Sequence, residues 1–221
     1  LYCSKHATSE HSVTSSFDND DGNIWFERTE HGWDKGRCKF CGAAQQAFDR
    51  GDVVETHAYA FIHTTRIEAR VAELFGGKMQ FDVIIGNPPY QLSDGGHGAS
   101  ASPIYHKFVE QAKALEPRFL SLVIPSRWFG GGKGLGEFRA SMLGDDRLRR
   151  IVDFENAKDA FPGVDLAGGV CYFLWDRDQP GLCEVTNIVG GISESASERQ
   201  LDEFSTFVRH SAAVPIIRKV T

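Results

Sequence analysis

Four consecutive residues, Asn87-Pro88-Pro89-Tyr90, combine groups that can hold a flat ring bearing an amine. Two successive prolines fix the backbone φ angles and remove two N–H donors, so the carbonyls of this turn are rigid and free to accept hydrogen bonds. An exocyclic amine can donate to the Asn87 side-chain oxygen and to the Pro88 carbonyl while the Tyr90 ring stacks on its ring. Holding both hydrogens localises the nitrogen lone pair and makes the amine a better nucleophile. Because the same four letters also occur in ordinary turns, the elements around them decide between the two interpretations.

The segment before this turn has the pattern of a buried strand. Residues 81–86 form a continuous apolar run bounded by turn residues, which is typical of a strand buried on both faces of a parallel sheet. Apolar runs and periodicity predict further strands at 58–62, 119–124, 151–154, 169–175 and 183–189, and helices at 66–75, 104–115, 138–143 and 201–220. The strands at 169–175 and 183–189 are expected to form an antiparallel pair.

Strands that alternate with helices predict an α/β sheet with helices on both sides. In such sheets ligands bind just beyond the carboxyl ends of the strands. The Asn87 turn and the loop Pro125-Ser126-Arg127-Trp128 both follow predicted strand ends. These two loops are therefore the candidates for a functional site.

Gly86-Asn87-Pro88-Pro89-Tyr90 resembles the hallmark motif of amino-directed methyltransferases, and the residues that follow are similar to the adenine-N6 DNA methyltransferases of restriction-modification systems. The loop at Arg127 resembles the family's loop after the next strand. Ala160-Phe161-Pro162, followed by the run 169–173, resembles a later motif that supplies a second aromatic ring. The resemblance implies a Rossmann-like sheet and methyl transfer from S-adenosylmethionine to an adenine flipped out of double-stranded DNA.

The resemblance also implies roles for individual residues. Asn87, Pro88, Pro89 and Tyr90 would be catalytic, and Tyr90 and Phe161 would stack on opposite faces of the adenine. For Phe161, packing in a loop is an equally good interpretation.

Asn87, Tyr105 and Phe108 would contact the methyl donor, although an ordinary amphipathic helix explains the last two equally well. Local positive charge and the glycine-rich loop at 130–134 indicate DNA contacts by Arg127, Trp128 and Lys133. That loop lacks the Gly-Lys-Ser/Thr ending of a nucleotide-binding loop.

One departure from the family pattern concerns the methyl donor. The glycine-rich turn after the first strand, and the acidic residue about 20 residues later, do not appear upstream of Asn87. We therefore expect a fragment whose sheet is incomplete in its N-terminal half, and which binds the donor weakly by itself. The expected organisation is a polar segment at 1–57, a catalytic subdomain at 58–192 and a helical connector at 193–221 that leads toward a target-recognition domain.

Cys38-Lys39-Phe40-Cys41-Gly42 forms a knuckle that supplies half of a zinc site, because structural zinc takes four ligands. Cys3, His6, His31, His57 and His63 are available as partners, but no second Cys-x-x-Cys pair exists. The alternative is a turn with two reduced thiols. Five cysteines in a chain without a secretory signal predict a reducing, cytoplasmic location.

Composition excludes some functions and leaves others open. No apolar run approaches the roughly 20 residues of a membrane helix. The net charge of −6 is the wrong sign for a protein that grips phosphates with its whole surface, but a locally basic cleft remains compatible with it.

Two other functions remain open. The first is a protein-glutamine N5-methyltransferase, because the amide of a substrate glutamine would offer the same kind of amine to the turn at Asn87. The second is a non-catalytic DNA-binding remnant, which would explain the missing donor motif. A restriction nuclease or specificity subunit, fused or separate, is an expected partner.

Overall fold

The computed structural model describes residues 31–45, 61–92, 102–164, 166–194 and 196–220. The chain divides into two compact units, which are considered separately below. Unit 1 comprises Leu1–Lys78 and Gln91–Gln111, and unit 2 comprises Met79–Tyr90 and Ala112–Thr221. Within the described residues, no helix has the length and apolar character needed to cross a membrane.

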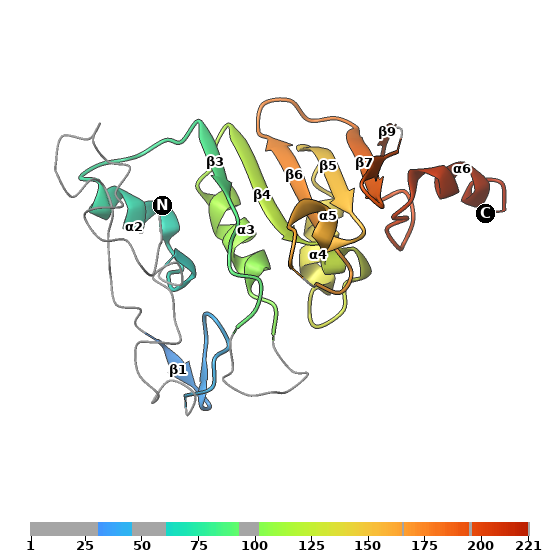
Figure 1. The fold of residues 1–221 in the computed structure, drawn as a ribbon. Helices are drawn as coiled ribbons and strands as arrows, with labels where there is room; N and C mark the ends of the chain where they lie inside the picture. The colour runs from blue at the N-terminus through green and yellow to red at the C-terminus, as the bar shows by residue number, and fades with distance from the viewer. Residues whose placement is uncertain (1–30, 46–60, 93–101, 165, 195, 221) are drawn as a thin grey trace. The chain divides into compact units, whose positions relative to one another are not determined.

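Unit 2 is built on a mixed sheet whose strands lie side by side in the order β3-β4-β6-β5-β7-β8, with β9 also paired to β7 (Figure 1). The pairs β3–β4 and β5–β7 are parallel, whereas β6 runs antiparallel to both of its neighbours. The strands are β3 (Val83–Gly86), β4 (Phe119–Pro125), β5 (Leu148–Phe154), β6 (Val170–Asp176), β7 (Cys183–Val189), β8 (Ile192–Ser193) and β9 (Ser197–Arg199). The expected α/β class is confirmed.

The central strands form where the sequence is most apolar. Leu120 and Ile124 of β4, Ile151 of β5 and Phe173 of β6 are completely buried. Their helical partners are short: η3 (Ser126–Gly130), α4 (Gly136–Leu143) and α5 (Ala157–Ala160). Burial of these side chains removes apolar surface from water and supplies the main stabilising free energy of the unit.

Asp145, in the turn before β5, lies at the centre of a polar cluster near the start of that strand. It accepts hydrogen bonds from Arg147, at 2.7 and 3.0 Å, and from the Trp175 indole at 2.9 Å, and it forms an ion pair with Lys113 at 2.5 Å. Burial of the carboxyl group acts to raise its pKa, but the bonds from Arg147, Lys113 and Trp175 outweigh that effect, so the pKa of Asp145 lies well below its ordinary value.

Three predictions about the elements of unit 2 are wrong. First, β6 does not pair with β7 but lies between β4 and β5, because its apolar residues fill the gap between those two strands. Second, β3 is not buried on both faces: Val83 is 54% and Ile85 76% exposed, since within the described residues the strand pairs only with β4.

The third concerns the segment 201–220, which is helical only in η4 (Ser211–Ala213) and α6 (Val214–Ile217). The rest follows a turning path because side chains of the sheet bind its backbone. Asn187 and Arg199 both donate to the Arg209 carbonyl, at 3.2 and 3.3 Å. Phe207 is buried.

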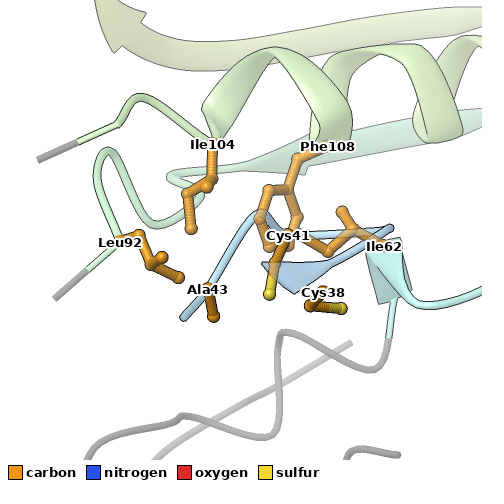
Figure 2. Packing of buried hydrophobic residues seen from close by; sticks show 7 residues of the cluster. All are labelled: Cys38, Cys41, Ala43, Ile62, Leu92, Ile104 and Phe108. Carbon is orange, nitrogen blue, oxygen red and sulfur yellow. The ribbon is translucent and has the colours of Figure 1, made fainter. Parts of the chain in front are cut away.

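Unit 1 contains a two-stranded hairpin, β1 (Trp33–Asp34) and β2 (Arg37–Cys38), the helix α2 (Ile67–Leu74) and the first turns of α3 (Tyr105–Ala114). Residues 58–60 of the strand predicted at 58–62 lie outside the described residues, and Phe61 and Ile62 form a 3₁₀ turn instead. The described core of unit 1 includes one cluster, shown in Figure 2, that comprises Cys38, Cys41, Ala43, Ile62, Leu92, Ile104 and Phe108.

Candidate functional site

Two loops of unit 2 emerge at the same edge of the sheet because β3 and β4 are parallel. Gly86, the last residue of β3, lies opposite Leu122 of β4, and β4 continues to Pro125. The chain then continues into Asn87 after the first strand and into Ser126 after the second. The carboxyl ends of parallel strands are where α/β sheets place their ligands, so the expected position of the Asn87 turn is confirmed.

A third loop joins this edge through β5 and β6. Phe154 at the end of β5 and Pro125 at the end of β4 both pair with Val170 at the start of β6. Gly169 holds this junction tightly, because a Cβ atom there would lie 2.0 Å from the Phe154 carbonyl oxygen. Its φ of +80° also favours glycine. The Ser126 amide donates to the Gly169 carbonyl at 3.0 Å and links the second loop to the third.

Tyr90 is half-buried, and its hydroxyl oxygen is enclosed. Burial raises the pKa of Tyr90, the nearby Cys171 side chain adds to the rise, and the Asn87 side chain acts in the opposite direction. Cys171 is fully buried in β6, and burial raises the pKa of its thiol to about 12. The tyrosine of the motif therefore lies against the start of β6, with its hydroxyl near Asn87 and both titratable groups protonated at neutral pH.

Asn87 is exposed, as a residue that binds a ligand from outside must be. Phe161 follows α5, whose first turn is capped by the Asn156 side chain accepting from the Lys158 amide at 3.0 Å. The Phe161 ring is partly exposed, and its amide donates to the Ala157 carbonyl at 2.8 Å. Asn87, Tyr90 and Phe161 thus all lie on loops at one edge of the sheet, while their joint action on a base remains a prediction.

A buried polar network, which the sequence interpretation did not include, supports the loop after β4. Asp153 of β5 is 1% exposed and accepts from the Ser126 hydroxyl at 2.6 Å. Arg209 donates to both carboxylate oxygens at 2.6 and 2.9 Å, and Asn187 donates at 3.3 Å. An aspartate inside the apolar run Ile151-Val152-Asp153-Phe154 was the available signal, because a buried carboxylate needs partners. Arg209, far along the chain, carries no local signal.

The loop after β4 places its three candidate DNA-binding residues differently. Lys133 is exposed and Arg127 partly exposed, but Trp128 is completely buried. Its ring stacks at 6.4 Å from that of Phe207 and meets Phe129 edge-on at 4.6 Å. Trp128 is therefore a core residue here, and contact between its ring and DNA would require the loop to open.

The two residues predicted to lie near the methyl donor are both buried on α3. Tyr105 is 1% and Phe108 6% exposed, and the Phe108 ring stacks on Phe61 at 6.1 Å. Phe108 is thus part of the core of unit 1 (Figure 2). The contacts of Phe108 account for its burial within unit 1, and a role of either residue toward the donor stays a prediction.

The Cys-x-x-Cys knuckle has two histidines beside it. The ligand atoms of His31, Cys38, Cys41 and His63 all lie within 4.8 Å of one another. The Cys41 sulfur is 3.7 Å from Nδ1 of His31. Both cysteines are reduced and buried. Burial lowers the pKa of His31, which favours the neutral imidazole. The two histidines had been among the five possible partners, but no spacing rule selected them.

The Asn-Pro-Pro-Tyr turn thus follows a strand of an α/β sheet, at the end where the strand it pairs with also ends. A model of the Eco57I restriction-modification methylase family matches residues 1–161. The chain therefore belongs to that family, which confirms the resemblance seen in its motifs.

One similar protein is an uncharacterized adenine-specific methylase of Mycoplasma pneumoniae, 36% identical over 176 residues. The alignment covers 75% of this chain and 41% of that relative, so the chain spans less than half the length of the relative it matches.

Two solved structures are more distant. The type I restriction-modification methyltransferase subunit of Streptococcus thermophilus has a TM-score of 0.36 and 14% identity, over 64% of this chain and 31% of that one. The EcoKI M protein has a TM-score of 0.32 and 18% identity, over 48% of this chain and 25% of that one.

Proposed function

We propose that the protein containing this chain is a DNA adenine-N6 methyltransferase of a restriction-modification system, and that this chain holds the target amine. The observation that carries the proposal is the position of Asn87-Pro88-Pro89-Tyr90 directly after β3, at the sheet edge that it shares with the loops of Ser126 and Phe161. Membership of the Eco57I family supports the proposal, as does the similarity to an adenine-specific methylase.

The amine is held by two neutral oxygens. The Asn87 side chain is exposed and accepts one N–H, and the Pro88 carbonyl accepts the other, because a proline-proline turn holds that carbonyl in place. The partly exposed rings of Tyr90 and Phe161 stack on the two faces of the base. Orientation of the lone pair, rather than removal of a proton, is then the main catalytic contribution of these residues.

The surroundings of Tyr90 agree with catalysis that uses no strong base. The pKa of Tyr90 is raised, and that of the buried Cys171 is about 12, so neither group is ionised at neutral pH. The acidity of the amine rises once it is methylated, and its proton can then leave to water.

The methyl donor of such enzymes is S-adenosylmethionine, which supplies an electrophilic methyl group when bound. The described residues alone do not build a cradle for it, since Tyr105 and Phe108 are covered by other side chains and no glycine-rich turn after a strand lies among the described residues before β3. The proposed chemistry is therefore confined to how this chain holds and orients the amine.

Double-stranded DNA is the proposed partner, with Arg127 and Lys133 as phosphate contacts from the loop after β4. A restriction nuclease or a specificity subunit belongs to the same proposal. A cytoplasmic location is also part of it, supported by the four reduced cysteines among the described residues.

The proposal is tested with the protein at its full encoded length, incubated with S-adenosylmethionine and unmethylated double-stranded DNA. Digestion of the DNA to nucleosides and mass spectrometry should find N6-methyladenine. Methylation of a protein glutamine, or of cytosine, in place of adenine would contradict the proposal.

A further inference from the structure

The four residues around the knuckle have the composition of a zinc site. Two cysteine sulfurs and two histidine nitrogens converge within 4.8 Å, and no carboxylate belongs to the group. Thiolate and imidazole ligands select zinc over calcium or magnesium, which prefer oxygen. We propose that His31, Cys38, Cys41 and His63 bind one Zn²⁺ in a closed structural site.

The spacing of the ligand atoms supports this assignment. Tetrahedral zinc has Zn–S bonds of about 2.3 Å and Zn–N bonds of about 2.0–2.1 Å, so a sulfur and a nitrogen on the same ion lie roughly 3.6 Å apart. Cys41 Sγ and His31 Nδ1 are 3.7 Å apart. The His31 and His63 rings meet edge to face with centroids 4.9 Å apart, which lets each direct a nitrogen to the same point.

The backbone of the knuckle is shaped around Cys38. The Phe40 amide donates to Cys38 Sγ at 3.4 Å. The Gly42 amide donates to the Cys38 carbonyl at 2.8 Å, and the Cys38 amide donates to the Ala43 carbonyl at 2.8 Å. Gly42 has a φ of +80°, as a turn this tight requires. The turn is thus held in a form that places both sulfurs beside the nitrogens of His31 and His63.

Other contacts fix the imidazole rings. Trp33 stacks on His31 with centroids 4.8 Å apart, and Phe40 packs against His63 at 5.5 Å. Orientation of the ligand rings by neighbouring side chains is a regular feature of metal sites. Four protein ligands leave no open position for water, so the metal would stabilise the fold and not catalyse a reaction.

The site would join two segments of unit 1 that lie apart in the sequence. His31 and the knuckle lie in the hairpin segment, whereas His63 lies in the turn before α2, 22 residues after Cys41. Among the described residues, the two cysteines belong to one buried cluster of unit 1, together with Ile62, Leu92 and Phe108 (Figure 2). A metal bound at this cluster would add folding free energy to the unit.

One residue of the cluster is also close in sequence to the proposed amine-binding turn. Leu92, in the core of unit 1, follows Tyr90 by two residues. Zinc would therefore stabilise the cluster to which Leu92 belongs. This role does not depend on the proposed methyltransferase activity, and its test needs no activity measurement.

The test begins with the purified 221-residue chain in reducing buffer. Elemental analysis should find about one zinc per chain, as four protein ligands require. Replacement of zinc by Co²⁺ should give the intense visible bands of a tetrahedral site, together with a sulfur-to-cobalt charge-transfer band. A chain without zinc that gives only the weak spectrum of six-coordinate Co²⁺ would overturn the proposal.

Variants separate a four-ligand site from a pair of thiols. Cys41→Ser, His31→Asn and His63→Asn should each weaken zinc binding at least tenfold, whereas Cys183→Ala, a buried cysteine of β7, should not change it. Zinc affinity that is unchanged in both histidine variants would overturn the assignment of His31 and His63.

Hydrogen exchange with and without a chelator keeps the proposal testable if a variant fails to fold. Removal of zinc should speed exchange in residues 31–45 and 61–74, while β5 and β6 stay protected. Equal exchange with and without the chelator would show that the metal has no structural role.

Discussion

Arg209 holds Asp153 through two hydrogen bonds, of 2.6 and 2.9 Å, although 56 residues separate them in the sequence. Asp153 is 1% exposed, and its carboxylate also accepts from Ser126 in the loop after β4. The pair therefore connects the C-terminal segment to one of the loops at the candidate site.

Arg209→Ala should lower the free energy of unfolding by about 2 kcal/mol or more, because it leaves a buried carboxylate without its countercharge. The loss should lie below that of a fully buried pair, since the Arg209 side chain is 28% exposed. Arg218→Ala is the matched control: Arg218 makes two bonds to Glu203, of 2.6 and 2.8 Å, but its side chain is 54% exposed, so the loss should be clearly smaller than that for Arg209→Ala. Urea unfolding measures both, and equal losses would contradict the assigned role.

Gly169 offers a second test of the junction between the loops. Gly169→Ala places a Cβ atom 2.0 Å from the Phe154 carbonyl oxygen and 2.6 Å from that of Glu155. Gly168 is the control, because it also has a positive φ, of +94°, but no atom lies within 4 Å of a Cβ there. Gly168→Ala should cost about 1–2 kcal/mol from backbone strain alone, and Gly169→Ala at least about 2 kcal/mol more. Thermal unfolding that ranks the two equally would show that the junction relaxes freely.

His106 predicts how stability changes with pH. Burial lowers the pKa of His106 to about 4, and the charge of Lys107 acts in the same direction. In the unfolded chain the pKa is about 6.5, so between about pH 6.5 and 4 the unfolded state binds a proton that the folded state does not. The free energy of unfolding should therefore fall as the pH falls from about 6.5 to 4, whereas above about pH 6.5 His106 should cause no change with pH.

The measurement compares wild type with His106→Gln by urea unfolding at a series of pH values. The free energy of unfolding of the wild type, measured relative to that of His106→Gln, should fall as the pH falls through this window. Titration of other groups, including any metal site, cancels in the difference. A difference that does not change with pH would contradict the assigned pKa shift.

The sequence was most informative where a structure depends on nearby residues. Continuous apolar runs placed β4, β5 and β7 correctly, since a buried strand reads directly as such a run. The pairing of β6 was predicted wrongly because adjacency along the chain favours a hairpin with β7, whereas burial places β6 between β4 and β5. The choice among distant partners is made by the packed sheet and leaves no local signal.

The candidate sites divide in the same way. The Asn87 turn was predictable because its four residues are consecutive and follow a strand. The role of Arg209 was not predictable. Asp153 stands out as a carboxylate inside an apolar run, but nothing near it in the sequence indicates that its partner is Arg209. His31 and His63 were visible as possible ligands, but only the folded chain brings them to the knuckle.

Phe161 and Tyr90 should act on the same base from opposite faces. At the protein's full encoded length, Tyr90→Ala and Phe161→Ala should each weaken capture of the flipped adenine by about 1–3 kcal/mol, the usual value of stacking on one base. Tyr90→Phe keeps the ring and should retain most of the activity. A fluorescent base analogue at the target position reports the extent of flipping. Normal flipping in Phe161→Ala would remove Phe161 from the site and leave the role of Tyr90 intact.

The central claim is that Asn87 orients the amine for methyl transfer, and the rate of N6-methyladenine formation under single-turnover conditions tests it most directly. Asn87 accepts a hydrogen bond that strengthens as the reacting geometry is reached, so its removal should affect the rate and not the binding of DNA. For Asn87→Ala at the full encoded length, we predict a rate lower by about 100-fold or more, with DNA affinity unchanged within about threefold. A variant that methylates adenine at the wild-type rate would contradict the account.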